Sequence, residues 1–108
     1  MRLVWHRAAV GDVEAISDYI RHDSPAAART VVRRLHTAAL RLAQFPLSGR
    51  AGLEPGTREL VVTRIPYVIV YRVVEQPTPP FVEIIGIFHG ARDRAGGGTA
   101  EDIRTRLR

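Results

Sequence analysis

The sequence contains neither cysteine nor lysine. Without cysteine there are no disulfides and no thiolate metal ligands, so nothing indicates a secreted, disulfide-stapled scaffold. Serine is scarce, and Ser17, Ser24 and Ser48 all lie outside a nucleophile-elbow context. Residues 96–98 form a glycine run with no preceding strand and no following lysine, which indicates a connection rather than a phosphate-binding loop. The sequence therefore gives poor support to hydrolysis through a covalent nucleophile.

Long apolar runs are also missing. Residues 1–6 include no extended apolar stretch, so we expect neither a signal peptide nor a membrane span, and the cytoplasm is the expected location. The histidines His6, His22 and His36 lie apart from one another and from carboxylates at metal-ligand spacing. We therefore expect no metal and no cofactor.

All sixteen basic residues are arginine, and the formal net charge is +5. Arginine has a very high pKa, so the calculated isoelectric point near 10.9 overstates how basic the chain is. The net charge suits an acidic partner, which is either a nucleic acid or an anionic protein segment.

The 108 residues fit one domain of marginal stability, so a partner that covers apolar surface would add to it. We assign residues 1–95 to this domain and residues 96–108 to a flexible or short helical tail. In the tail, Ile103 and Leu107 have the spacing for one or two turns of helix.

Helical periodicity dominates the first half of the chain, after a short strand predicted at residues 2–6. Apolar side chains from Ala9 to Ile20 form one stripe, from which Asp12 lies away, and this predicts a helix over residues 8–21. A second stripe runs from Ala28 to Phe45. Ser24-Pro25 forms its predicted N-terminal cap, and Pro46 ends the helix. The short connection predicts an antiparallel helical hairpin.

Strands are predicted at residues 57–64, 67–74 and 81–89. The middle one is apolar on both faces, which is typical of a central strand. The order is β-α-α-β-β-β. The fold class is therefore α+β, with the helical hairpin packed on a mainly antiparallel four-stranded sheet. We expect the second face of the sheet to be left to water or to a partner.

Strand-borne arginines are the first candidates for function. Period-two spacing puts Arg58 and Arg64 on one strand face, and Arg72 lies near the end of the central strand. Guanidinium groups on a sheet suit the recognition of phosphate or carboxylate. The alternative is that they are solvated side chains or charges that protect a strand edge.

His89 ends the last predicted strand, where a histidine can act as a general acid or base or orient a phosphate. The alternative is a structural histidine bonded to a backbone carbonyl. The arginines of the second helix, among them Arg34 and Arg41 one heptad apart, form either a basic binding face or a solvated one. Tyr67 and Tyr71 share a strand face and are expected to pack under the helices, with base stacking as the alternative.

Several short motifs occur in a characteristic order over residues 3–93. They are Trp5, Asp18-Tyr19-Ile20, Pro25-Ala26-Ala27-Ala28, Leu42 to Pro46, Ser48-Gly49-Arg50, Gly56-Thr57-Arg58-Glu59-Leu60, Tyr67 to Arg72, and Ile87-Phe88-His89-Gly90-Ala91-Arg92. This set resembles the RelE/ParE family of toxins from type II toxin–antitoxin modules. The resemblance implies a cognate antitoxin that wraps an extended, partly helical segment over the toxin in a hetero-oligomer, with no membrane partner.

Members of this family differ in their target. RelE-like toxins cleave messenger RNA on the ribosome, and the resemblance offers Arg58, His89 and Arg92 as a reduced catalytic set. However, Val68 stands where RelE-like toxins carry arginine, and no tyrosine follows Tyr71. The resemblance therefore favours the ParE-like branch, which poisons DNA gyrase by binding and not as an enzyme.

A third hypothesis is a toxin-derived remnant that binds its antitoxin and helps to repress their operon. Under any of the three, a surface for the target or the antitoxin is expected. The residues assigned to it are Arg50, Arg58, Arg64, Arg72, His89 and Arg92.

Overall fold

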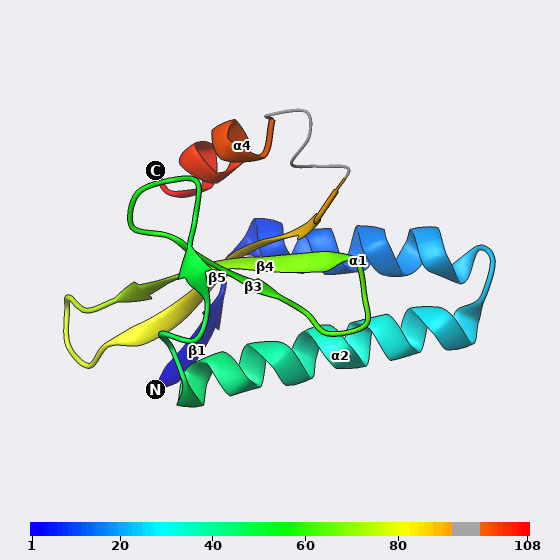
Figure 1. Ribbon diagram of the computed structural model, residues 1–108, viewed down its shortest axis with the longest axis horizontal. Helices are drawn as coiled ribbons and strands as arrows, with labels where there is room; N and C mark the ends of the chain where they lie inside the picture. The colour runs from blue at the N-terminus through cyan, green and yellow to red at the C-terminus, as the bar shows by residue number, and fades with distance from the viewer. Residues whose placement is uncertain (92–97) are drawn as a thin grey trace.

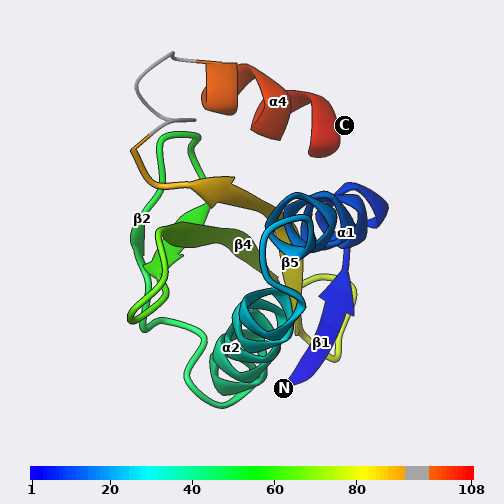
Figure 2. The same ribbon diagram turned by 90° about the vertical axis from the view of Figure 1, so that its right-hand side faces the viewer.

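A pair of antiparallel helices covers one face of a five-stranded sheet in the computed structural model, which describes residues 1–91 and 98–108 (Figures 1 and 2). A further helix, near the C-terminus, lies over the opposite face. The elements in chain order are β1 Arg2–Trp5, α1 Arg7–Arg21, α2 Pro25–Gln44, β2 Arg50–Ala51, β3 Arg58–Val61, β4 Tyr67–Val74, β5 Phe81–His89 and α4 Gly98–Arg106. The predicted α+β class is confirmed, with one strand more than expected.

The strands are ordered β1-β5-β4-β3-β2, so β4 is the middle strand. Four of its first five residues are at most 3% exposed, which confirms the inference drawn from its two apolar faces. The β1–β5 pair is parallel and the other pairs are antiparallel. The additional strand, β2, has two residues and pairs with the start of β3.

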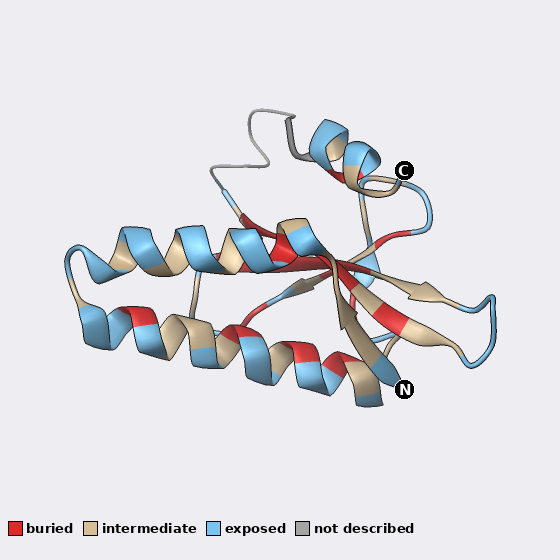
Figure 3. Ribbon diagram, turned by 180° about the vertical axis from the view of Figure 1, so that it is seen from behind, coloured by how far each residue is buried: buried red, intermediate tan, exposed pale blue. Residues whose placement is uncertain are grey.

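The helical hairpin follows the predicted boundaries closely. Ser24 caps α2 through its hydroxyl, which accepts a hydrogen bond from the amide of Ala27 at 3.1 Å. The cap of α1 is unexpected, because the Nδ1 atom of His6 accepts from the amide of Ala8 at 2.9 Å. Figure 3 shows the result of the two apolar stripes: the outer surfaces of the helices are exposed and the faces toward the sheet are buried.

The main core lies between the hairpin and the sheet. Leu35 and Leu42 of α2 pack there with Ile69 and Tyr71 of β4, and all four are fully buried. Tyr67 belongs to the same cluster and is 6% exposed. The expectation that both tyrosines pack under the helices is confirmed.

The strand predicted over residues 57–64 is shorter than expected, and the expectation that Arg58 and Arg64 share a face is wrong. The strand ends at Val61, the amide of Val62 donates to the carbonyl of Tyr67 at 3.1 Å, and the chain turns back between them. Arg64 lies in this turn with a left-handed φ of 69°. The turn removes Arg64 from the alternation of the strand.

The second face of the sheet is partly covered by the chain itself, which corrects the expectation that this face is left to water or to a partner. Ile103 of α4 is fully buried against Val70, Ile85 and Phe88, and Leu107 packs beside them. These side chains form a second, smaller core. The one or two helical turns that Ile103 and Leu107 suggested in the sequence are thus an α-helix with a packed face, which ends at Arg106.

A half-buried ion pair holds α4 to α1 across the edge of β5. Both oxygens of Asp12 accept from the guanidinium of Arg106, at 2.6 and 3.1 Å. One of them also accepts from the amide of Ile87 at 2.9 Å, a residue of β5 beyond the end of β1. Asp12 lies off the apolar stripe, as the sequence indicated, but it bonds to two distant segments. A bidentate arginine–carboxylate pair of this kind is among the stronger polar contacts in proteins.

Of the helices in residues 1–91 and 98–108, none is long and apolar enough to cross a membrane.

Replacement of Ile103 with alanine should lower the free energy of unfolding by about 2 kcal/mol or more, because the side chain is fully buried in the second core. Asp102→Ala, at an exposed position of the same helix, is the matched control and should change the free energy little. Urea unfolding followed by circular dichroism measures both. Equal midpoints for the two variants would show that the packing of α4 adds no stability.

Candidate functional site

The guanidinium of Arg58 forms hydrogen bonds within the fold. Its Nη1 atom donates to the carbonyl of Gly49 at 2.8 Å and more weakly to that of Leu47 at 3.4 Å. Both carbonyls belong to the connection between α2 and β2. The guanidinium therefore holds this connection against the start of β3.

Tyr71 holds the same connection from the core side. Its hydroxyl donates to the carbonyl of Pro46 at 2.8 Å and accepts from the amide of Gly49 at 2.9 Å. Gly49 fits so closely that an added Cβ would lie 2.6 Å from this hydroxyl and 2.7 Å from the carbonyl oxygen of Glu59. The motif of Ser48, Gly49 and Arg50, which carried part of the family resemblance, thus has a steric reason in the fold.

Two further predicted arginines form ion pairs. Arg72 bonds through Nε to Glu83 of the neighbouring strand at 2.7 Å. Arg50 lies 3.4 Å from Glu59, a carboxylate that is almost completely buried. Arg64 is exposed in its turn. These arginines therefore lie on different parts of the sheet, and two of them already neutralise carboxylates.

His89 ends β5 opposite Tyr67, and the two rings meet edge to face with centroids 5.6 Å apart. Arg58 lies opposite Tyr71, four residues further along β4. At about 3.4 Å per residue, roughly 13 Å of strand separates the two positions. Arg92 lies outside the described residues. Arg58 and His89 do not meet at a common reacting atom.

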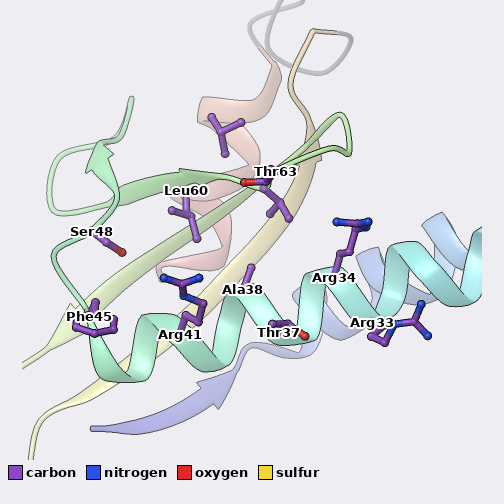
Figure 4. A pocket seen from close by; sticks show the side chains of 11 residues that line it. Arg33, Arg34, Thr37, Ala38, Arg41, Phe45, Ser48, Leu60 and Thr63 are labelled. Carbon is purple, nitrogen blue, oxygen red and sulfur yellow. The ribbon is translucent and has the colours of Figure 1, made fainter.

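A groove with a volume of about 760 Å³ lies between α2 and β3 (Figure 4). We call it the α2–β3 groove. Its lining residues are Arg33, Arg34, Thr37, Ala38, Arg41, Phe45, Ser48, Leu60, Val61, Val62 and Thr63.

The α2–β3 groove combines positive charge with apolar surface. Arg34 and Arg41 extend from α2 toward the sheet side of the groove, as Figure 4 shows. Among the described residues, no carboxylate lies within ion-pair distance of either arginine. Phe45, at the end of α2, is 58% exposed, and Val61 of β3 is 56% exposed with its side chain on the sheet face away from α2. Exposed apolar side chains gathered with unneutralised cations are typical of a binding surface.

Phe45 departs from the prediction, which placed it on the buried stripe of the second helix. The helix ends at Gln44, and Phe45 is its C-cap with non-helical angles, φ −129° and ψ 71°. This change of backbone direction turns the ring out of the core. The sequence identified Arg34 and Arg41 as a basic face, but it gave no signal that β3 would supply the opposite wall.

The edge of β3 is open along this groove. Because Val62 bonds to Tyr67, the even-numbered residues of β3 bond to β4 and the odd-numbered ones direct their main-chain groups outward. The outward N–H and C=O of Glu59 face Arg50 of β2. This is the last residue pair between β2 and β3 in the direction of Val61. The N–H and C=O of Val61 therefore point to the open side.

Metal binding finds no support in the described part of the chain, where no group of three or more histidine, aspartate or glutamate side chains could hold an ion.

Comparison with known proteins agrees with this fold. Residues 3–94 match the model of the family described as the ParE toxin of the type II toxin–antitoxin system, parDE. The chain belongs to the ParE toxin family. It is 42% identical to putative toxin Y4kP of Sinorhizobium fredii (strain NBRC 101917 / NGR234) over 88 residues, covering 82% of this chain and 86% of that protein. It is 44% identical to toxin RelE2 of Caulobacter vibrioides (strain ATCC 19089 / CIP 103742 / CB 15) over 91 residues, covering 84% and 97%.

A solved structure of a chromosomal ParDE toxin–antitoxin system from P. aeruginosa is similar to this ParE-family chain, with a TM-score of 0.70 and 28% identity. The match covers 82% of this chain and 95% of that one. The resemblance seen in the sequence is confirmed: this is a toxin of a type II toxin–antitoxin system, and an antitoxin is its expected partner.

Gly49→Ala should destabilise this ParE-family toxin by about 1–3 kcal/mol, because the new methyl group meets the Tyr71 hydroxyl and a strand carbonyl. Gly11→Ala is the matched control. Gly11 lies within α1 with no atom near an added Cβ, so alanine there should stabilise by about 0.5–1 kcal/mol through helix propensity. Chemical denaturation gives both values. Stabilisation by both substitutions would contradict the close fit at Gly49.

Proposed function

We propose that this ParE-family toxin acts by binding DNA gyrase and not by cleaving RNA, and that a cognate antitoxin silences it. The observation that carries the proposal is the separation of Arg58 from His89. Cleavage of RNA through its 2′-hydroxyl needs a base, cationic stabilisation of the phosphorane and an acid at one reacting centre. Arg58 instead bonds to two carbonyls of its own loop, and His89 lies about 13 Å further along the sheet.

The remaining predicted arginines support the same proposal. Arg50 and Arg72 are engaged with carboxylates, and Arg64 lies in a turn. A toxin that acts by binding needs no assembled acid and base, only surface of suitable shape and charge. Gyrase and the antitoxin are both cytoplasmic in this proposal, and the toxin and antitoxin form a hetero-oligomer in which the toxin is held silent.

Purified toxin should inhibit the supercoiling of relaxed plasmid by gyrase and should leave ribosome-bound messenger RNA intact. The physical reason is that binding surface is present while the catalytic set is not brought together. Agarose gels of the plasmid and primer extension on the message measure the two outcomes. Normal supercoiling together with cleaved message would replace this proposal with the RelE-like ribonuclease, and the absence of growth arrest in cells that express the chain alone would favour the non-toxic remnant.

His89→Ala should leave growth arrest unchanged, because the ring contributes packing beside Tyr67 and no proton transfer. A ribonuclease would lose about 10² or more in rate when a general acid or base is removed. Arg58→Ala should lower the melting temperature by loosening the connection held at Gly49, while folded protein keeps its toxicity. Growth of cells that express each variant measures its toxicity. Thermal melting of each purified variant is the control for folding. Cleavage of messenger RNA by the unsubstituted toxin that is lost in a fully folded His89→Ala variant would refute the binding mechanism.

A further inference from the structure

We infer that the outer face of α2 binds the phosphate backbone of duplex DNA, so that the toxin contacts the DNA on which gyrase acts as well as the gyrase protein. We call this surface the α2 arginine face, and its members are Arg29, Arg33, Arg34, Thr37 and Arg41. The inference rests on the proposed function, because gyrase brings the toxin and the duplex together, and it adds a ligand and the residues that contact it.

The net positive charge of the chain is concentrated on α2. Between Pro25 and Gln44 the helix carries four arginines and neither aspartate nor glutamate. The chain has sixteen arginines, so the twelve outside α2 stand against all eleven of its acidic residues. Four of the five net charges therefore belong to one helix, whose outer surface is exposed (Figure 3). A cationic field localised in this way attracts a polyanion to that surface.

The arginines of this face have no counter-charge within the described part of the chain. No described carboxylate lies within ion-pair distance of any of the four. On the neighbouring helix α1, by contrast, Asp12 is paired with Arg106 and Asp18 with Arg21. These two carboxylates are neutralised by other arginines, so the α2 arginine face keeps its charge for a ligand.

The helix presents the members of this face on one surface. At about 100° per residue, they fall within an arc of about 140°, on the side opposite Leu35 and Leu42, which are buried in the core. Arg29 and Arg41 are twelve residues apart, or about 18 Å along the helix axis. One strand of duplex DNA rises about 3.4 Å per nucleotide, so this length spans about five phosphates. Figure 4 shows four of the five members along α2.

The chemistry of this face fits a phosphate backbone better than a protein partner. Guanidinium groups only donate hydrogen bonds, the hydroxyl of Thr37 can also donate, and phosphate oxygens accept. Protein interfaces have a centre from which charged residues are depleted, whereas DNA-binding surfaces are strongly positive. Among the described residues, Leu40 is the one large apolar side chain of α2 that is exposed. Contacts to phosphates carry no sequence information, so we expect binding that is independent of the DNA sequence.

The test is binding of a fluorescein-labelled duplex of about 20 base pairs to the purified full-length toxin, followed by fluorescence anisotropy. Because four arginines displace counterions, affinity should fall about a hundredfold when the salt concentration rises from about 50 mM to about 200 mM. The double variant R29E/R33E should bind about tenfold or more weakly at low salt, because reversal replaces attraction with repulsion. R7E/R108E reverses the same number of charges at exposed positions outside α2, and its affinity should stay within about threefold.

A neutral double variant, R29Q/R33Q, tests the phosphate contacts directly. It removes two of the four cationic contacts without adding repulsion. The slope of log affinity against log salt should therefore fall in magnitude from about 3.6 to about 1.8, a readout that a purely structural role would not move. Thermal melting of every variant is the control for folding. Where R29E/R33E is unfolded, R29Q/R33Q carries the decision.

Several outcomes overturn the inference. Absence of duplex binding at low salt, equal binding by R29E/R33E and R7E/R108E, or an unchanged salt slope in R29Q/R33Q would each do so. Tighter binding of a single-stranded RNA of the same length, lost in R29E/R33E, would assign the face to RNA instead. Displacement of the duplex by polyglutamate at a lower concentration than by unlabelled duplex would assign it to an acidic protein segment.

The proposed function fails separately from this inference. If gyrase is unaffected by the toxin while the duplex binds as described, the gyrase target is wrong and the DNA-binding face stands. If the folded R29E/R33E variant inhibits supercoiling at the same concentration as the unsubstituted toxin, gyrase remains the target and the α2 arginine face is not part of the inhibitory contact.

Discussion

The hydroxyl of Tyr71 is the interaction on which the arrangement of the α2–β3 groove depends. It lies at the end of a fully buried side chain of the middle strand, and it bonds both to the carbonyl of Pro46 and to the amide of Gly49. Buried polar groups need partners, so the bonds fix the chain that leaves α2 at one distance from the sheet. Arg58 holds the same loop from outside through the Gly49 carbonyl. The end of α2 and the edge of β3 thereby line one groove.

The two faces of the sheet are covered by different helices. One is covered by the helical hairpin over a core of large side chains, and the other by α4 over a small one. The helix α4 is tied to distant parts of the chain by the Asp12–Arg106 pair and by the Arg104–Glu54 pair. This second face is therefore partly covered by the chain, and among the described strands β3 has main-chain groups left unpaired beyond the end of β2.

Arginine serves three distinct purposes in this toxin. Arg58 satisfies backbone carbonyls, Arg72 and Arg106 neutralise carboxylates, and Arg34 and Arg41 remain available at a groove. A planar guanidinium with five donors suits all three uses, so the residue type by itself does not distinguish them. This is why a list of strand-borne arginines described the charge of the surface but did not indicate which of them are engaged within the fold.

The sequence by itself determined the fold class, the hairpin with its Ser24 cap, the central strand and the family, because periodicity, capping and motif order are local properties of the chain. It also indicated the basic face of α2. Only the tertiary structure decided which arginines are free to bind a ligand, because the partners of Arg58 and Arg72 come from other segments. Tertiary packing likewise turned Phe45 outward, removed Arg64 from its strand and buried Ile103. These outcomes depend on turns and contacts between residues far apart in sequence, which local patterns do not encode.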